Sequence, residues 1–212
     1  MSKDLNALIK GFAHFKERYT DQNRAEFERL VELGQQPTIL VIACCDARVD
    51  PAIITESDAG DMLVVRNIAN LVPPYSSSGE YMAIQAAVEL AISYLKVTDI
   101  IVMGHSRCMG VATLVNRMKD DADPQHPLEQ WTQIAEPAAR EVFDSMPNAS
   151  LDDLTCACSR KAVGVSLNNL QDYPWVADAL ARNAVKLHGW YFNLAERELL
   201  ALDESGDWAA LC

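Results

Sequence analysis

Two short segments carry residue types that can bind a metal ion. Cys44 follows one apolar run, and His105 and Cys108 follow another. Two thiolates and one imidazole are the ligand set of a catalytic zinc ion that keeps its fourth tetrahedral position for water. Asp46 and Arg48 share the face of Cys44 if the segment is extended, because alternate side chains then point the same way. The sequence therefore predicts a zinc site at Cys44, His105 and Cys108, with Asp46 and Arg48 beside the water.

The remaining cysteines fit a ligand role less well. Cys45 lacks the C-x-D-x-R spacing that Cys44 has, and we expect it to pack in the core. Cys156 and Cys158 fall in a predicted helix, where residues two apart point about 200° away from each other, so both are interpreted as structural. Cys212 is expected to be a free thiol at the chain end. Six unevenly placed cysteines favour a reducing compartment over a disulfide scaffold.

The composition is that of an acidic globular protein. The 212 residues are 50% hydrophobic and carry a formal net charge of -12. A chain of this length can bury a full core, so we expect one domain over residues 1–212. The acidic surplus argues against a nucleic-acid partner, because phosphate binding needs clustered Lys and Arg. No apolar run approaches the roughly 18 residues of a membrane span, and residues 1–20 lack the core of a secretion signal, so we expect a cytoplasmic protein without a membrane partner.

The apolar pattern alternates between strands and helices and predicts an α/β fold. Continuous apolar runs at 38–43, 62–65 and 100–103 are typical of strands buried on both faces of a parallel sheet. Such strands require a crossover, and helical spacing over 79–95 supplies one. We thus expect a central, mainly parallel β-sheet flanked by helices. The other predicted elements are helices at 6–19, 23–33, 128–145 with a break near Pro137, 151–170 and 174–182, and terminal strands at 186–193 and 199–203.

The predicted sheet brings the segment with Cys44 close to the segment with His105 and Cys108. Cys44 and His105 each follow a predicted buried strand, and ligands of open α/β sheets gather outside the carboxyl ends of the strands. His105 and Cys108 are three positions apart, about one helical turn, so a turn that opens a helix lets both reach one ion. The two segments are therefore expected to meet despite their distance along the chain.

Four motifs resemble the β-class carbonic anhydrases: Cys44-x-Asp46-x-Arg48, the segment VRNIANLVPP at 65–74, Gly104-His105-x-x-Cys108, and LHGWYF at 187–192. The resemblance runs from about Gly34 to Asp203. It implies reversible hydration of carbon dioxide to bicarbonate and a proton, with one zinc ion per chain held by the three predicted ligands. A zinc-bound hydroxide is then the nucleophile, and Asp46 and Arg48 are the catalytic dyad that orients it. The resemblance also implies a dimer or a dimer of dimers, with residues 1–33 forming a helical arm over the partner subunit.

Other positions refine the resemblance. Gln35 matches a glutamine that the plant-type subgroup uses to bind substrate near the zinc, and that subgroup keeps the fourth zinc position open. Arg66 and Asn67 are expected to support the site rather than take part in the chemistry. Met109 stands where the family usually has glycine, and we expect it to narrow or reshape the pocket. Because two thiolates cancel the charge of the zinc ion, activity is expected to rise into the alkaline range.

Three alternative functions remain open at this point. The first is hydrolysis of a sulfur analogue of carbon dioxide, which Met109 could favour. The second is a non-catalytic, zinc-stabilised regulatory protein, against which the Asp46 and Arg48 pair argues. The third is a redox sensor that uses the adjacent thiols of Cys44 and Cys45. A nucleotide-binding function is disfavoured, because the chain contains neither G-x-G-x-x-G nor G-x-x-x-x-G-K-[ST].

Overall fold

The computed structural model describes residues 4–22, 24–79 and 81–211, which divide into two compact units at Gln36. The first unit contains α1 (Leu5–Glu17), the π-helical turn η1 (Arg18–Gln22) and α2 (Arg24–Leu33). Asp4 caps α1 by accepting a 2.8 Å hydrogen bond from the Ala7 N–H. The rings of Phe15 and Phe27 contact each other across the two helices, with centroids 6.1 Å apart. The helices predicted at 6–19 and 23–33 are confirmed, except that residue 23 lies outside the described residues.

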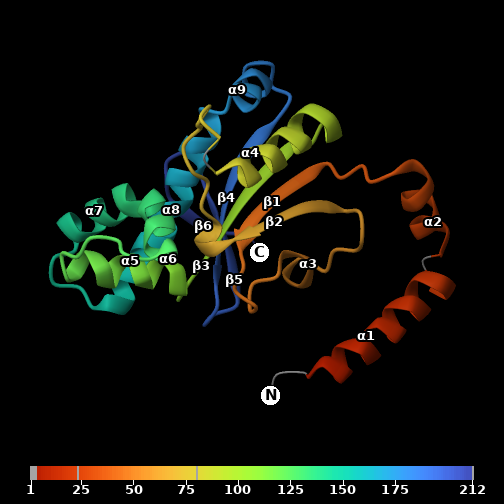
Figure 1. The fold of residues 1–212 in the computed structure, drawn as a ribbon, viewed down its shortest axis with the longest axis horizontal. Coiled ribbons are helices and arrows are strands. Elements are labelled where there is room, and N and C mark those ends of the chain that lie inside the picture. Colours follow the sequence, from red (N-terminus) through yellow and green to blue (C-terminus); the bar gives the residue numbers. More distant parts are fainter. Residues whose placement is uncertain (1–3, 23, 80, 212) are drawn as a thin grey trace. The chain divides into compact units, whose positions relative to one another are not determined.

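The second unit is built on a mixed sheet of six strands in the order β2-β1-β3-β4-β5-β6 (Figure 1). The strands β1 to β4 run parallel, and β5 and β6 continue the sheet antiparallel. The predicted α/β fold with a mainly parallel sheet is confirmed, whereas β6 was not expected. The strands are β1 (Ile39–Cys44), β2 (Met62–Asn67), β3 (Asp99–His105), β4 (Lys186–Asn193), β5 (Glu198–Leu202) and β6 (Trp208–Ala210).

Helices connect and cover these strands. The crossover between β2 and β3 is α4 (Met82–Glu89), which continues as the π-helical segment η3 (Leu90–Leu95). The helix predicted over 128–145 is divided into α6 (Pro127–Thr132), the 3-10 turn η4 (Gln133–Ala135) and α7 (Glu136–Ser145), close to the expected break. The remaining helical elements are α3 (Pro51–Ile54), η2 (Ile68–Asn70), α5 (Met109–Lys119), α8 (Leu151–Gln171) and α9 (Pro174–Ala181). Of these, α3 and η2 were not predicted, and α5 was expected only as a helix that opens after His105 and Cys108, without bounds.

The core lies on both faces of the sheet, as the unbroken apolar strands predict. Leu40 and Ile42 of β1 pack into a cluster with α4, α8 and α9. Val41 and Ala43, which point to the opposite face, pack with Ile101 and Met103 of β3. A third cluster joins α5, α7 and α8 to the carboxyl end of β1, so the edge where the strands end is also packed. Within the described residues, no helix combines the length and the apolar character needed to cross a membrane.

Candidate metal centre

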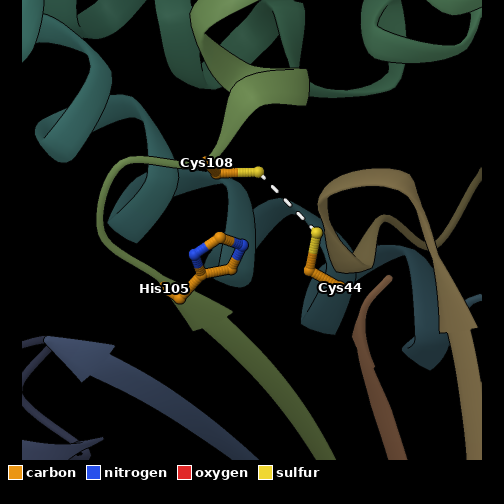
Figure 2. A group of neighbouring side chains, drawn as sticks. All are labelled: Cys44, His105 and Cys108. Carbon is orange, nitrogen blue, oxygen red and sulfur yellow. Dashed lines mark hydrogen bonds between the residues drawn. The ribbon is translucent and has the colours of Figure 1, made fainter. Parts of the chain in front are cut away.

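The three predicted ligands meet at the carboxyl edge of the sheet (Figure 2). Cys44 is the last residue of β1 and His105 is the last residue of β3, and these strands are parallel neighbours. Cys108 is the N-cap residue of α5. The Sγ atoms of Cys44 and Cys108 are 3.9 Å apart, and the ligand atoms of all three residues lie within 4.8 Å of one another. This spacing allows one ion to contact all three.

The hydrogen bonds of His105 leave one ring nitrogen available to a cation. Its Nδ1 lies 2.9 Å from the carbonyl oxygen of Ser106, so Nδ1 carries the proton and donates. In the neutral ring Nε2 then has a lone pair, and this buried atom has no hydrogen-bond partner within the described part of the chain. Buried polar atoms are rarely left unpaired, because burial without a partner is costly. The Nε2 atom therefore fits a metal ligand whose ring is oriented by its other nitrogen.

The two thiols are arranged so that one loses its proton readily. The hydrogen bond from Cys108 lowers the pKa of Cys44 to about 4. The same interaction, together with burial, raises the pKa of Cys108. The Sγ of Cys44 also accepts a 3.4 Å hydrogen bond from the N–H of Ala69. A cation that binds both sulfurs displaces the shared proton, so the donor set of two thiolates and one imidazole suits zinc.

Asp46 and Arg48 form a bidentate ion pair beside this group. The Nε of Arg48 donates to Oδ1 of Asp46 over 3.0 Å, and Nη2 donates to Oδ2 over 2.7 Å. The backbone N–H of Arg48 donates to Oδ1 as well, over 2.9 Å. The hydrogen bonds from Arg48 lower the pKa of Asp46 to about 2, so this carboxylate stays ionised at neutral pH. Asp46 faces Arg48 and is not one of the grouped ligand residues.

Arg66 supports the segment that carries these groups, as expected from the sequence. Its Nε donates to the carbonyl oxygen of Cys44 over 3.0 Å, and its Nη2 donates to the carbonyl oxygen of Asp46 over 2.6 Å. Its Nη1 makes an ion pair with Oδ2 of Asp50 at 2.6 Å. The side chain of Asn67 makes hydrogen bonds with both the N–H and the carbonyl oxygen of Leu71. These contacts fix the turns after β1 and β2.

The expectation that Cys45 packs in the core was wrong. Cys45 is exposed, because β1 ends at Cys44 and the chain leaves the covered part of the sheet there. Its N–H still donates to the carbonyl oxygen of Asn67 over 2.8 Å, so only the main chain remains tied to the sheet. Cys158 is buried and Cys156 is half-buried, and neither joins the ligand group. Cys212 lies outside the described residues.

The position that excludes a side chain lies one residue after Met109, at Gly110. Met109 begins α5 with its side chain 78% exposed, and it is absent from the residues with positive φ, so its position accepts a side chain without strain. A Cβ atom added at Gly110 would instead lie 2.6 Å from Cγ2 of Ile68 and 3.2 Å from Cβ of Ala69. Sequence reasoning missed Gly110, although a glycine beside a ligand was the signal available.

Gln35 is exposed in the first unit, and its role remains a prediction.

Comparison with known proteins decides the family. Residues 39–199 match the family described as carbonic anhydrase. The chain is 36% identical over 201 residues to a carbonic anhydrase of Synechocystis sp., covering 94% of this chain and 71% of that relative. The solved structure of the β-carbonic anhydrase CcaA superimposes with a TM-score of 0.86 at 35% identity, covering 98% of this chain and 92% of that chain. The chain belongs to the β-class carbonic anhydrases.

This membership confirms the family resemblance found in the sequence. A tetrameric β-carbonic anhydrase of Sordaria macrospora has the same fold, with a TM-score of 0.79 at 26% identity over 96% of each chain. β-Carbonic anhydrases are zinc enzymes, and the buried Cys44, His105 and Cys108 form the group in this member that could hold the ion.

Proposed function

We propose that the chain catalyses the reversible hydration of carbon dioxide to bicarbonate and a proton, with one zinc ion held by Cys44, His105 and Cys108. The observation that carries this proposal is the buried Nε2 of His105, which has no partner among the described residues and belongs to the same group as two thiols. When bound, zinc supplies a Lewis acid that makes a water molecule nucleophilic near neutral pH.

Asp46 is the residue that orients the reacting water molecule. Its carboxylate is ionised and has two hydrogen bonds from the Arg48 guanidinium, so it remains an acceptor for a hydrogen of the reacting water. By accepting this hydrogen bond, Asp46 directs a lone pair of the water oxygen towards carbon dioxide. Asp46 therefore raises the rate by orienting the nucleophile and not by removing a proton. Arg48 also keeps Asp46 from turning towards the ligand group, so that a bound zinc ion would remain open to water. Arg66 is a positioning residue for the same carboxylate, through the Asp46 carbonyl oxygen.

The plant-type assignment and the assembly belong to the same proposal. Gln35 would bind substrate near the zinc ion, as the resemblance to the plant-type subgroup implies. The exposed apolar side chains of α1, with Leu5, Leu8, Ile9 and Phe12 each at least 60% exposed, favour an arm that packs on a partner subunit. We propose a homodimer or a dimer of dimers, in which residues 1–212 are one functional domain and residues 1–33 form the arm. The relative from Sordaria macrospora is described as tetrameric, which agrees with such an assembly.

The test is stopped-flow hydration of carbon dioxide by purified protein of measured zinc content, from neutral to alkaline pH. We expect about one zinc ion per chain and a rate that rises with pH. Full zinc occupancy without hydration at any pH would contradict the proposal. Carbonyl sulfide and carbon disulfide assayed on the same sample would then separate a hydrolase of sulfur analogues from a non-catalytic zinc protein.

A further inference from the structure

A second cavity lies away from the metal centre, between α7, α8 and the hairpin of β5 and β6. Its volume is about 420 Å³, which is within the usual range for small-molecule pockets. Val142, Met146 and Trp208 give it apolar walls, and Arg160 and Lys161 are its ionisable lining residues. Both are cationic, although the chain as a whole has a net charge of -12. The cavity therefore combines an apolar interior with local positive charge.

Among the described residues, Lys161 has a carboxylate partner and Arg160 has none. The Nζ of Lys161 pairs with Oε2 of Glu141 at 2.8 Å, and both side chains are exposed. Arg160 has no ion pair within residues 4–22, 24–79 and 81–211. Its Nε is buried and has no hydrogen-bond partner in the same residues. A guanidinium that lines a cavity without an ion pair suits a carboxylate.

Contact with the Tyr191 ring holds Arg160 in place. Its Cζ lies 4.8 Å from the centroid of the Tyr191 ring, which is a cation–π contact. The Tyr191 ring also contacts Trp208, with centroids 5.7 Å apart. Arg160 is therefore positioned before any ligand arrives, which lowers the entropy cost of binding.

Gly164 keeps the cavity open. It lies within α8 and lines the cavity, and a Cβ atom added there would meet no atom within 4 Å. Glycine destabilises a helix interior relative to alanine, and here no close packing requires it. The space beside Gly164 is thus available to a ligand.

We propose that this cavity binds a small organic anion that has one carboxylate and an apolar body, such as a medium-chain fatty acid. The carboxylate pairs with Arg160, and the apolar body lies against Val142, Met146 and Trp208. Charge complementarity selects this class, since a neutral ligand would leave Arg160 unpaired and a small inorganic anion would leave the apolar walls uncovered. The site is separate from the proposed carbon dioxide chemistry, and its test does not depend on that chemistry.

The experiment is isothermal titration of the zinc-loaded full chain with sodium octanoate, 1-octanol and sodium acetate. We expect octanoate to bind saturably with one site per chain. The other two ligands should bind at least about tenfold more weakly, because octanol lacks the charge-assisted hydrogen bonds and acetate lacks the apolar body. Gly164→Leu should abolish octanoate binding by filling the cavity, while Gly164→Ala, a matched control in the same helix, should retain it. Arg160→Gln should weaken octanoate binding at least about tenfold.

Several results would overturn the proposal. They are the absence of saturable octanoate binding, equal affinity for octanoate and octanol, and octanoate affinity unchanged by Gly164→Leu. A change of oligomeric state in Gly164→Leu, measured by light scattering, would also overturn it, because the cavity would then be a contact between copies of the chain. Circular dichroism and carbon dioxide hydration of each variant check that it is folded.

Discussion

The guanidinium of Arg66 donates a 2.6 Å hydrogen bond to the main-chain carbonyl oxygen of Asp46. The same guanidinium donates to the carbonyl oxygen of Cys44 over 3.0 Å. One side chain from β2 therefore holds both ends of the short segment that joins a predicted metal ligand to the predicted catalytic carboxylate. Removal of Arg66 is expected to loosen the position of Asp46 without removing any donor atom from the ligand group.

Arg66→Ala should lower kcat/KM for carbon dioxide hydration by about 10- to 100-fold while zinc stays bound. Losses of this size are usual for residues that do not contact the metal but hydrogen-bond to the groups around it. Stopped-flow kinetics and metal analysis of the same sample provide the measurement. Arg182→Ala is the matched control, because Arg182 forms an exposed ion pair with Asp178 and should not affect kcat/KM. An unchanged kcat/KM in Arg66→Ala would show that the turn is held by its other contacts.

Arg48→Ala should lower kcat by roughly 100-fold and retain zinc, because Asp46 loses the partner that fixes its orientation. Arg48→Lys should recover only part of this loss, since an ammonium group cannot make the bidentate pair. The kinetic and metal measurements are the same as for Arg66. Loss of zinc together with activity would assign Arg48 a structural role instead.

The two neighbouring cysteines after β1 should differ in their effect on metal binding. Cys44→Ser should lower the zinc content well below one ion per chain and lower the melting temperature, because a bound ion stabilises the folded state. Cys45→Ser changes an exposed thiol next to it and should leave both quantities unchanged. Metal analysis and thermal unfolding test the pair. Equal zinc loss in the two variants would contradict the ligand assignment.

The ionised Glu136 carboxylate should make the free energy of unfolding fall as the pH becomes acidic. Burial alone would raise the pKa of Glu136, but hydrogen bonds from Arg140 and Arg117 outweigh this effect, so its pKa lies below the ordinary value of 4.5. The contribution of Glu136 to stability is therefore complete above about pH 4.5, and it is lost as the pH falls through the lowered pKa.

Glu136→Gln tests this dependence directly. At pH 7 the variant should be less stable by about 2 kcal/mol, because the partly buried Arg117 loses a charged acceptor. The difference from the original chain should shrink as the pH falls below 4.5, and urea unfolding at several pH values measures it. A difference that is constant with pH would rule out a role for the charge of Glu136.

Gly110→Ala should disturb the metal centre. The added methyl group would lie 2.6 Å from Cγ2 of Ile68, so the segment that brings the Ala69 N–H to Cys44 must shift. Overpacking of this kind costs about 1–3 kcal/mol, and we expect a lower melting temperature and weaker zinc binding. Gly164→Ala is the contrasting variant, because nothing lies near its added Cβ, and it should be as stable as the original chain or more stable. Equal stability of the two variants would contradict the packing argument for Gly110.

Much of the fold follows from local patterns. The apolar runs at 38–43 and 100–103 correspond to β1 and β3, because a strand buried on both faces must be apolar at every position. The run at 62–65 corresponds to β2, but the expected burial on both faces was wrong there, because β2 lies at the edge of the sheet and its residues are half-buried or exposed. Short elements carry too few residues for a periodic signal, which is why α3 with four residues and β6 with three were not predicted. These elements form where capping by Asp50 and pairing with β5 stabilise them.

The sequence by itself determined the residue types of the metal centre and the ends of the strands that carry them, because spacing and apolar patterning are local properties. Only the tertiary structure decided which nitrogen of His105 is available, that Arg66 holds the turn of Asp46, and that Cys45 is exposed. The first depends on the backbone conformation at the end of β3, the second on a contact between residues 20 positions apart, and the third on where β1 leaves the packed sheet. These features are set when the strands assemble, so apolar patterning and residue spacing do not encode them.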